Sequence, residues 1–254
     1  MYTEYQPSHL LVPYIDNYWE FKGNPDYGMR IHILPDGCTD FIFTLGEVAN
    51  AVEEGSLIMQ PYRSYFVGPM TKYSELVTYT ESIHMFGVRF LPCGLSCFTN
   101  LPLHEFVNSR VSTNEMKAVF DDTFIEKLGE QKHVTDRIRV VEEYLLAYLA
   151  RHYQPADSHV AMAVNMINHS KGKRSVRSLM DDVCLCQRHF ERKFKHYTGF
   201  TPKEYSRIVK FKNAVELLRT TTSANLLTTA VDAGYYDLAH FSKEIKSMSG
   251  NTPA

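Results

Sequence analysis

The sequence predicts an α+β protein with two domains. An N-terminal domain over residues 1–153 is expected to contain a β-sandwich or small barrel followed by helices, and an all-helical domain is expected over residues 154–254. Three observations predict this division: short aromatic segments with Gly and Pro turns fill residues 17–90, helical periodicity begins near residue 103, and two stretches of the last third repeat one another. With 44% hydrophobic residues, the chain can bury a real core.

Four short segments have the composition of β-strands. Residues 17–21 alternate and are aromatic, and residues 82–90 form another apolar segment. Residues 29–34 and 39–45 flank the sequence Pro35-Asp36-Gly37-Cys38. That sequence favours a turn, because Pro presets φ and Gly accepts a positive φ. Several short strands with such turns predict a sandwich or a small barrel.

Two helices are expected at the end of the N-terminal domain. The first begins at Ser112, which has capping-box spacing to Glu115, and continues to about Gly129. The second covers residues 133–152 and has an apolar stripe along one side. Leu145 and Leu149 of that stripe form either a dimer surface or part of the domain's own core. Residues 153–157 break the helix and mark the domain boundary.

The C-terminal domain is predicted to be helical throughout. The expected helices cover residues 158–169, 176–183, 186–197, 203–220, 226–233 and 237–248. Ser175 and Asp237 are suitable N-caps, and Pro202 stands at a helix start, where proline is tolerated.

Two stretches of this domain are degenerate copies, offset by 51 residues. The matched pairs are His189-Phe190 with His240-Phe241, Phe194-Lys195 with Ile245-Lys246, Gly199 and Pro202 with Gly250 and Pro253, Arg192 with Lys243, and Thr198 with Ser249. Each copy is predicted to be a helix-turn-helix motif with a basic outer face, and a linker helix at residues 203–220 joins the two. Two helix-turn-helix motifs in one chain are suited to binding two adjacent segments of DNA.

Charge is distributed unevenly along the chain. Residues 1–155 carry 12 Lys and Arg against 20 Asp and Glu, whereas residues 156–254 carry 15 against 9. A basic segment attached to an acidic domain is typical of proteins that bind a polyanion.

The N-terminus lacks a signal-peptide pattern, no apolar run reaches the length of a membrane span, and five cysteines without paired spacing suggest a reducing compartment. A cytoplasmic protein without a membrane partner is expected.

An ordered set of positions in this domain matches a known family pattern. The set comprises Leu179, Phe190, Phe194-Lys195, Gly199, Pro202, Ala230, Gly234-Tyr235, Asp237, His240-Phe241, Lys246, Gly250 and Pro253. Residues from about 160 to 254 therefore resemble the DNA-binding domain of AraC/XylS-type transcriptional regulators. Residues 18–20, 33–43 and 87–92 are similar to N-terminal domains fused to some of these regulators.

The resemblance implies a sequence-specific transcription regulator that binds double-stranded DNA. Its N-terminal domain is expected either to sense a small-molecule effector or to serve only as a dimerisation or protein-interaction platform. One pair of motifs contacts few bases, so two copies of the chain, as a homodimer, are expected on DNA. RNA polymerase is a further partner if the protein is an activator.

Outward side chains of the two recognition helices are the candidate base contacts. In the first helix they are Gln187, Arg188, Glu191 and Arg192, and in the second they are His240 and Lys243. Arg suits guanine, Gln suits adenine and Glu suits the amino group of cytosine. The candidate phosphate contacts are Lys195 and Lys246, together with Lys173, Arg174 and Lys203.

Three features depart from the family pattern. Cys186 stands where the family often has a polar N-cap, so the first recognition helix is expected to be weakly capped. Leu238 and Ala239 open the second recognition helix and cannot hydrogen-bond a base edge, although both can touch a thymine methyl group. The sequence stops at Pro253-Ala254, before the family's closing helix, which we expect to weaken the second motif.

An enzymatic alternative uses cysteine chemistry. A DNA-alkylation repair or response protein would place N-terminal cysteine thiolates, here Cys38, Cys93 and Cys97, beside a similar DNA-binding module. That chemistry requires four thiolates. Only these three cysteines lie in the N-terminal part, so we favour the interpretation that they are small buried side chains. The protein is then expected not to be an enzyme, and no catalytic residue, metal site or cofactor is expected. Cys184 and Cys186 are expected to pack inside the first motif.

A pocket lined by aromatic side chains is a candidate effector site. Its expected lining residues are Trp19, Phe21, Phe41, Phe43 and Phe86, which all fall on predicted strands. Apolar pockets with a few polar groups are the usual form of a small-molecule site. Most of these side chains are nevertheless expected to fill the core.

Overall fold

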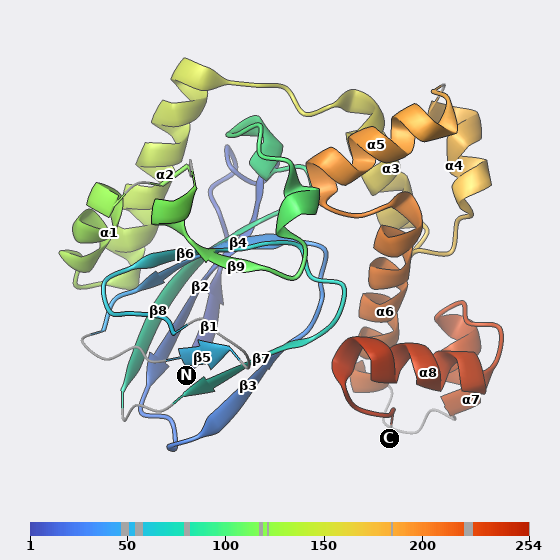
Figure 1. Cartoon of the computed structure of the whole chain (residues 1–254), viewed down its shortest axis with the longest axis horizontal. Helices are drawn as coiled ribbons and strands as arrows, with labels where there is room; N and C mark the ends of the chain where they lie inside the picture. Colours follow the sequence, from blue (N-terminus) through green and yellow to red (C-terminus); the bar gives the residue numbers. More distant parts are fainter. Residues whose placement is uncertain are drawn as a thin grey trace.

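The computed structural model describes residues 1–46, 51–53, 58–78, 82–116, 119–120, 122–183, 185–220 and 226–253. A β-rich N-terminal part and a helical C-terminal part lie side by side (Figure 1). Both parts of the predicted α+β fold are confirmed.

Two antiparallel sheets form the N-terminal part. In the described part of the chain, one sheet has six strands in the order β1-β2-β8-β4-β6-β9, and the other has three in the order β3-β7-β5. The strands are β1 (Tyr2–Tyr5), β2 (Ile15–Gly23), β3 (Met29–Ile33), β4 (Thr39–Thr44), β5 (Ala51–Glu53), β6 (Ser64–Val67), β7 (Ser74–Thr78), β8 (Ile83–Phe90) and β9 (Arg110–Ser112). All four strands expected from the sequence are present as β2, β3, β4 and β8.

Strand β4 shows how one segment serves two cores. All six of its residues are buried. Because side chains alternate along a strand, Phe41 and Phe43 face the helices that cover the six-stranded sheet, whereas Ile42 faces the three-stranded sheet. The two sheets thus enclose an apolar layer of their own.

The turn at residues 35–38 carries the chain from one sheet to the other. Strand β3 before the turn belongs to the three-stranded sheet, and β4 after it belongs to the six-stranded sheet. Gly37 has a φ of 86°, as the Pro-Asp-Gly sequence predicts. A Cβ atom on Gly37 would lie 2.8 Å from the ring of Tyr205, so the turn rests directly on the helical part.

Helices α1 (Asp122–Gly129) and α2 (Val134–His152) cover the outer face of the six-stranded sheet (Figure 1). The expected helix from Ser112 to Gly129 is wrong in its first part. Ser112 ends strand β9, which pairs with β6, and its side chain caps nothing. Met116 is extended at φ −141°, so no helix continues from the short 3-10 helix at Thr113–Glu115.

The apolar stripe of α2 packs into the domain's own core. Val141 and Leu145 are fully buried, and Leu149 is half-buried against the same cluster. Of the two roles left open by the sequence, the core role therefore holds for Leu145.

The helical part contains α3 (Ser158–His169), α4 (Val176–Val183), α5 (Gln187–Thr198), α6 (Pro202–Thr220), α7 (Leu226–Asp232) and α8 (Leu238–Ser249). The predicted helices are confirmed, and their ends agree within one or two residues. Ser175 Oγ accepts a hydrogen bond from Ser178 N at 3.1 Å, and Asp237 Oδ1 accepts one from His240 N at 2.7 Å, so both predicted caps form. No helix among the described residues combines the length and apolar character that a bilayer crossing needs.

Further contacts join the two parts. Gly199, after α5, lies against Pro69 and the carbonyl of Leu103. At the end of α5, His196 Nε2 lies 3.1 Å from Asn100 Oδ1. Gly250, after α8, lies against the ring of Tyr73. Both helix-turn-helix motifs therefore touch the N-terminal part.

Candidate nucleic-acid interface and interdomain pocket

Helix α5, predicted to be the first recognition helix, has one buried face and one basic exposed face. Phe190 and Phe194 are fully buried in the helical core, as predicted. Arg188, Arg192 and Lys195 are exposed. Arg188 and Arg192 are four residues apart, so they lie one above the other on the helix surface.

Two other predicted base contacts of α5 are paired with each other. Gln187 Nε2 donates to Glu191 Oε1 at 2.9 Å, and Glu191 is half-buried. Cys186 makes no side-chain cap, as expected from its thiol. Cys186 is exposed, so the prediction that it packs inside the motif is wrong; the N-cap position precedes the helix and faces solvent. Cys184 lies outside the described residues.

Helix α8, predicted to be the second recognition helix, repeats this arrangement. Phe241 and Ile245 are buried, and His240, Lys243 and Lys246 are exposed. Leu238 and Ala239 are also exposed at its first turn.

The sequence repeat extends to single hydrogen bonds. Thr198 Oγ1 donates to Phe194 O at 2.7 Å and accepts from Phe200 N at 3.2 Å. Ser249 Oγ donates to Ile245 O at 2.8 Å and accepts from Asn251 N at 3.2 Å. Each of these helices ends at a left-handed glycine, Gly199 or Gly250, whose N–H bonds the carbonyl four residues back. The two motifs are therefore built alike.

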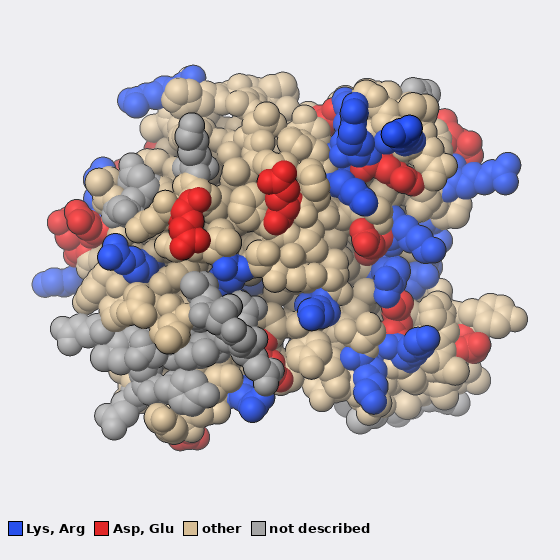
Figure 2. Space-filling model, viewed as in Figure 1, with Lys and Arg blue, Asp and Glu red and all other residues tan. Residues whose placement is uncertain are grey.

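A concave basic surface lies between the motifs, along α6. Its cationic lining residues are Lys173, Arg174, Lys203, Arg207 and Lys210, and its volume is about 630 Å³. Figure 2 shows Lys and Arg gathered over the helical part of the face in view. The sequence analysis missed Arg207 and Lys210, although their spacing from Lys203 places all three on one side of α6.

Some of these cations already have partners. Arg174 is held by Asp182 and Ser178, and Arg207 Nε donates to Glu244 Oε2 at 3.1 Å. Lys210 Nζ donates to Gly234 O at 3.2 Å, and burial lowers the pKa of Lys210. Lys173 and Lys203 are exposed. The exposed pair is thus better placed than Arg174 to meet a phosphate.

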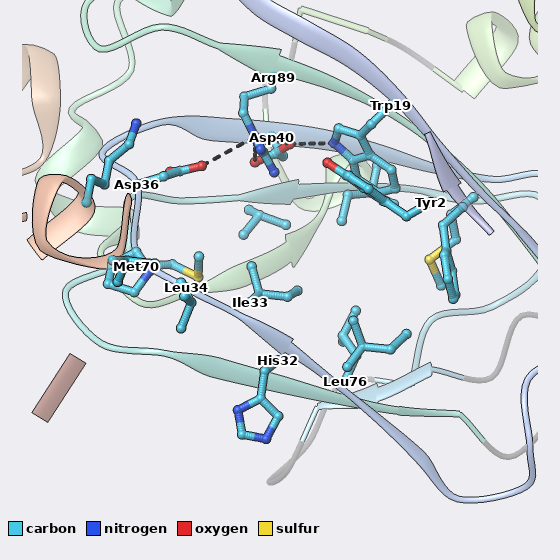
Figure 3. Close-up of a pocket in the computed structure, with 18 of the residues that line it drawn as sticks. Tyr2, Trp19, His32, Ile33, Leu34, Asp36, Asp40, Met70, Leu76 and Arg89 are labelled. Atoms are coloured by element: carbon cyan, nitrogen blue, oxygen red, sulfur yellow. Dashed lines mark hydrogen bonds and ion pairs between the residues drawn. The ribbon is translucent and has the colours of Figure 1, made fainter. Parts of the chain in front are cut away.

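A second concave feature, the interdomain pocket, lies between the two sheets and helix α6. Its volume is about 500 Å³. Figure 3 shows Ile33, Leu34, Met70 and Leu76 around it. Phe211 and Val215 of α6 add apolar surface from the helical part.

Two of the five aromatic residues proposed from the sequence line this pocket. Trp19 and Phe21 do so, whereas Phe41, Phe43 and Phe86 are fully buried on the opposite face of the same sheet. The alternation of side chains along β2, β4 and β8 separates the two groups.

One end of the interdomain pocket is ionic. Arg89 Nε lies 3.2 Å from Asp40 Oδ1 and 3.4 Å from Asp36 Oδ2, and Trp19 Nε1 donates to Asp40 Oδ1 at 2.7 Å (Figure 3). Burial raises the pKa of Asp40, although Arg89 opposes the rise. Asp36, Asp40 and Arg89 lie within the motifs noted in the sequence, but no role was predicted for them.

The side of the pocket formed by α6 carries Lys212, Glu216 and Arg219. Lys212 and Arg219 are exposed, and neither forms an ion pair within the part of the chain that the structure describes. These two cations are therefore available to a ligand.

The N-terminal cysteines Cys38, Cys93 and Cys97 are all buried. Cys93 packs in the core of the helical part and Cys97 in the core of the N-terminal part. Burial raises the pKa of the Cys38, Cys93 and Cys97 thiols. A nucleophilic thiolate needs the opposite shift, so nothing here favours the repair alternative.

Comparison with protein-family models gives two matches. Residues 179–254 match a family described as a helix-turn-helix domain, HTH_18. This match covers the two motifs described above. The C-terminal part is an AraC-type DNA-binding domain. Residues 3–112 match a family described as a domain of unknown function, DUF6597. No curated protein sequence matches the chain.

Solved structures extend the likeness in fold to both parts. A structure of ToxT from Vibrio cholerae has a TM-score of 0.53 at 9% identity, covering 93% of this chain and 96% of that one. ToxT from strain O395 bound to (E)-4-(8-methylnaphthalen-1-yl)but-3-enoic acid has a TM-score of 0.51 at 9% identity, with the same coverage. The xylose-binding transcription activator XylR overlaps less, at 19% identity over 47% of this chain and 37% of that one, with a TM-score of 0.35. The AraC-type domain thus follows an N-terminal domain, as in the ToxT fold.

Proposed function

We propose that the chain is a sequence-specific transcription regulator that inserts α5 and α8 into two adjacent segments of the major groove. One observation carries the proposal: two recognition helices built alike are joined by α6, and both expose basic residues. A helix fits the major groove, where each base pair presents a distinct pattern of donors and acceptors.

Base recognition by hydrogen bonds falls mainly to the first motif. Arg188 and Arg192 are the candidate guanine contacts, and Gln187 and Glu191 become available when their mutual hydrogen bond opens. His240 and Lys243 serve the second motif. The proposed phosphate contacts are Lys173, Lys195, Lys203, Arg207, Lys210 and Lys246.

We propose that residues 1–153 form the regulatory domain and residues 154–254 the DNA-binding domain. The regulatory domain binds a small-molecule effector in the interdomain pocket. Its apolar walls and the cations Lys212 and Arg219 suit an amphipathic carboxylate. ToxT, which shares the fold, has been crystallised with a butenoic acid that carries a naphthyl group.

Two copies of the chain are proposed to act together on DNA, because one pair of motifs contacts few base pairs. A selected binding site that contains the motif twice, at a fixed spacing, would support this assembly. RNA polymerase is the further partner if the regulator activates transcription.

The test is selection from a randomised duplex pool with the whole chain, followed by fluorescence anisotropy over a salt series. We expect a defined motif, and six phosphate contacts predict a log–log salt slope of about −5. Lys203→Ala should reduce the slope by about 1, whereas Lys132→Ala, which removes an exposed cation of the N-terminal part, should not. Binding without selected sequence, or affinity independent of salt, would contradict the proposal.

A further inference from the structure

The first turn of α8 exposes two apolar side chains at the place where a recognition helix meets base edges. Leu238 is 38% exposed, and Ala239 beside it is also exposed. Ala239 lies one turn before Lys243 and two turns before Lys246, on the side opposite the buried face. In helix-turn-helix proteins the N-terminal residues of the recognition helix contact the bases.

The position of this turn is fixed by its neighbours. Asp237 Oδ1 accepts the hydrogen bond of His240 N at 2.7 Å, which caps the helix. Tyr235 is buried just before the cap, and its ring packs at 5.2 Å between centroids against Phe241. The two apolar side chains are therefore presented by an ordered helix start.

Positive charge follows this apolar spot along the helix. Lys243 and Lys246 are exposed on α8, and the exposed Asp237 before the spot is engaged in capping the helix. A surface of this kind matches a DNA groove better than an apolar protein partner, because phosphates flank the groove and the C5 methyl of thymine is the apolar group on its floor. We propose that α8 selects T·A pairs by packing Leu238 and Ala239 against thymine methyl groups. The proposal rests on the proposed function, since it requires α8 to enter the major groove.

Replacing thymine with uracil, which removes only the C5 methyl group, tests the proposed contact. Two randomised duplex pools are prepared, one with thymidine and one with deoxyuridine, and the whole chain selects from each. The segment under α8 should be T-rich in the first pool and lose that preference in the second. On the selected duplex, each buried methyl removed should weaken binding about fourfold, equivalent to about 0.8 kcal/mol.

A second measurement separates the methyl group from other effects of uridine. With cytosine at the same position, 5-methylcytosine should bind about fourfold more tightly than cytosine. The variant Leu238→Ser should lose most of the difference between thymidine and uridine. Leu238→Ala, a smaller change that keeps an apolar helix start, should lose part of it.

The matched control is Leu227→Ser on α7, which removes a side chain that is 49% exposed but not on a recognition helix. It should leave both the selected motif and the uridine effect unchanged. No selected motif in the thymidine pool would overturn the proposed function itself. The same motif and affinity in both pools, or a uridine effect that survives Leu238→Ser, would overturn only the methyl contact.

Discussion

A single residue pair shows how tightly the interdomain pocket is built. Trp19 and Gly87 are directly opposite each other on β2 and β8. A Cβ atom on Gly87 would lie 1.9 Å from the indole of Trp19, so the ring fills the space that a side chain at this position would need. From there Trp19 Nε1 reaches Asp40, which also holds Arg89. The glycine thus sets the position of the ionic end of the pocket.

We predict that Gly87→Ala displaces Trp19 and lowers the free energy of unfolding by about 1–3 kcal/mol, as expected for overpacking a core. The measurement is urea unfolding followed by intrinsic fluorescence, since the chain has one Trp. Gly129→Ala is the control, because a Cβ there meets nothing within 4 Å; its stability should be equal or slightly higher. Equal stability of Gly87→Ala and the native chain would contradict this packing.

For Trp19, the sequence predicts the strand on which the residue lies but not the residue that it contacts. The aromatic alternation at residues 17–21 predicts β2 correctly. The partner of Trp19 depends on register with a strand far away in the chain, and local pattern carries no information on that register. The ionic cluster of Asp36, Asp40 and Arg89 was missed for the same reason.

Among the elements, two capping-box patterns show where local signals fail. Ser112 and Glu115 have the right spacing, yet Ser112 ends a strand because β9 pairs with β6. Thr201 and Glu204 have the same spacing and do cap α6: Thr201 N donates to Glu204 Oε2 at 2.7 Å, and Glu204 N donates to Thr201 Oγ1 at 3.1 Å. Long-range pairing overrides the local pattern in the first case.

The helices of the C-terminal domain were predicted better because their signals are local. Each has 3.6-residue periodicity, and several have a cap or a closing glycine within a few residues. The exposed faces of α5 and α8 followed from the buried positions of Phe190 and Phe241. The hydrogen bond between Gln187 and Glu191 was not predicted, because both side chains were expected to contact bases.

We predict different consequences for cations on the two recognition helices. Arg192→Ala should cost about 1–3 kcal/mol at the selected site and relax preference at one position, as for a bidentate contact with guanine. Lys246→Ala should weaken all sequences about equally, because a phosphate contact carries no base information. Selection from a random duplex pool measures both, after circular dichroism shows folded protein. An unchanged motif with Arg192→Ala and an altered one with Lys246→Ala would reverse the assignment.

Across the whole molecule, helix α6 connects the interdomain pocket with both motifs. Phe211 and Val215 line the pocket, and the same helix begins directly after the first motif. Tyr205 of α6 also supports the turn at Gly37, close to Asp36 in the ionic end of the pocket. A ligand that moves α6 against the sheets would therefore move both motifs relative to the N-terminal part.

The sequence predicted a β-rich part and a helical part, but not how the two parts pack against each other. Leu34 and Cys93 belong to the N-terminal part in sequence, yet both pack against the core of the helical part. An apolar side chain on a predicted strand gives no sign of which neighbour covers it. For the same reason, the contribution of α6 to the pocket became visible only in the assembled structure.

The last prediction couples the interdomain pocket to DNA. At 100 times its Kd, an amphipathic carboxylate should stabilise the whole chain by about 2.7 kcal/mol, which raises the Tm by about 5–10 °C. Lys212→Ala should reduce this shift, whereas Lys203→Ala, which removes an exposed cation of α6 outside the pocket, should not.

If the ligand changes the affinity for the selected duplex by some factor, the duplex must change the affinity for the ligand by the same factor, because linkage is reciprocal. Anisotropy with and without ligand, and ligand titration with and without duplex, measure the two sides. A shift that survives Lys212→Ala would place the ligand elsewhere, and a ligand that binds without altering DNA affinity would show that the pocket is not coupled to DNA binding.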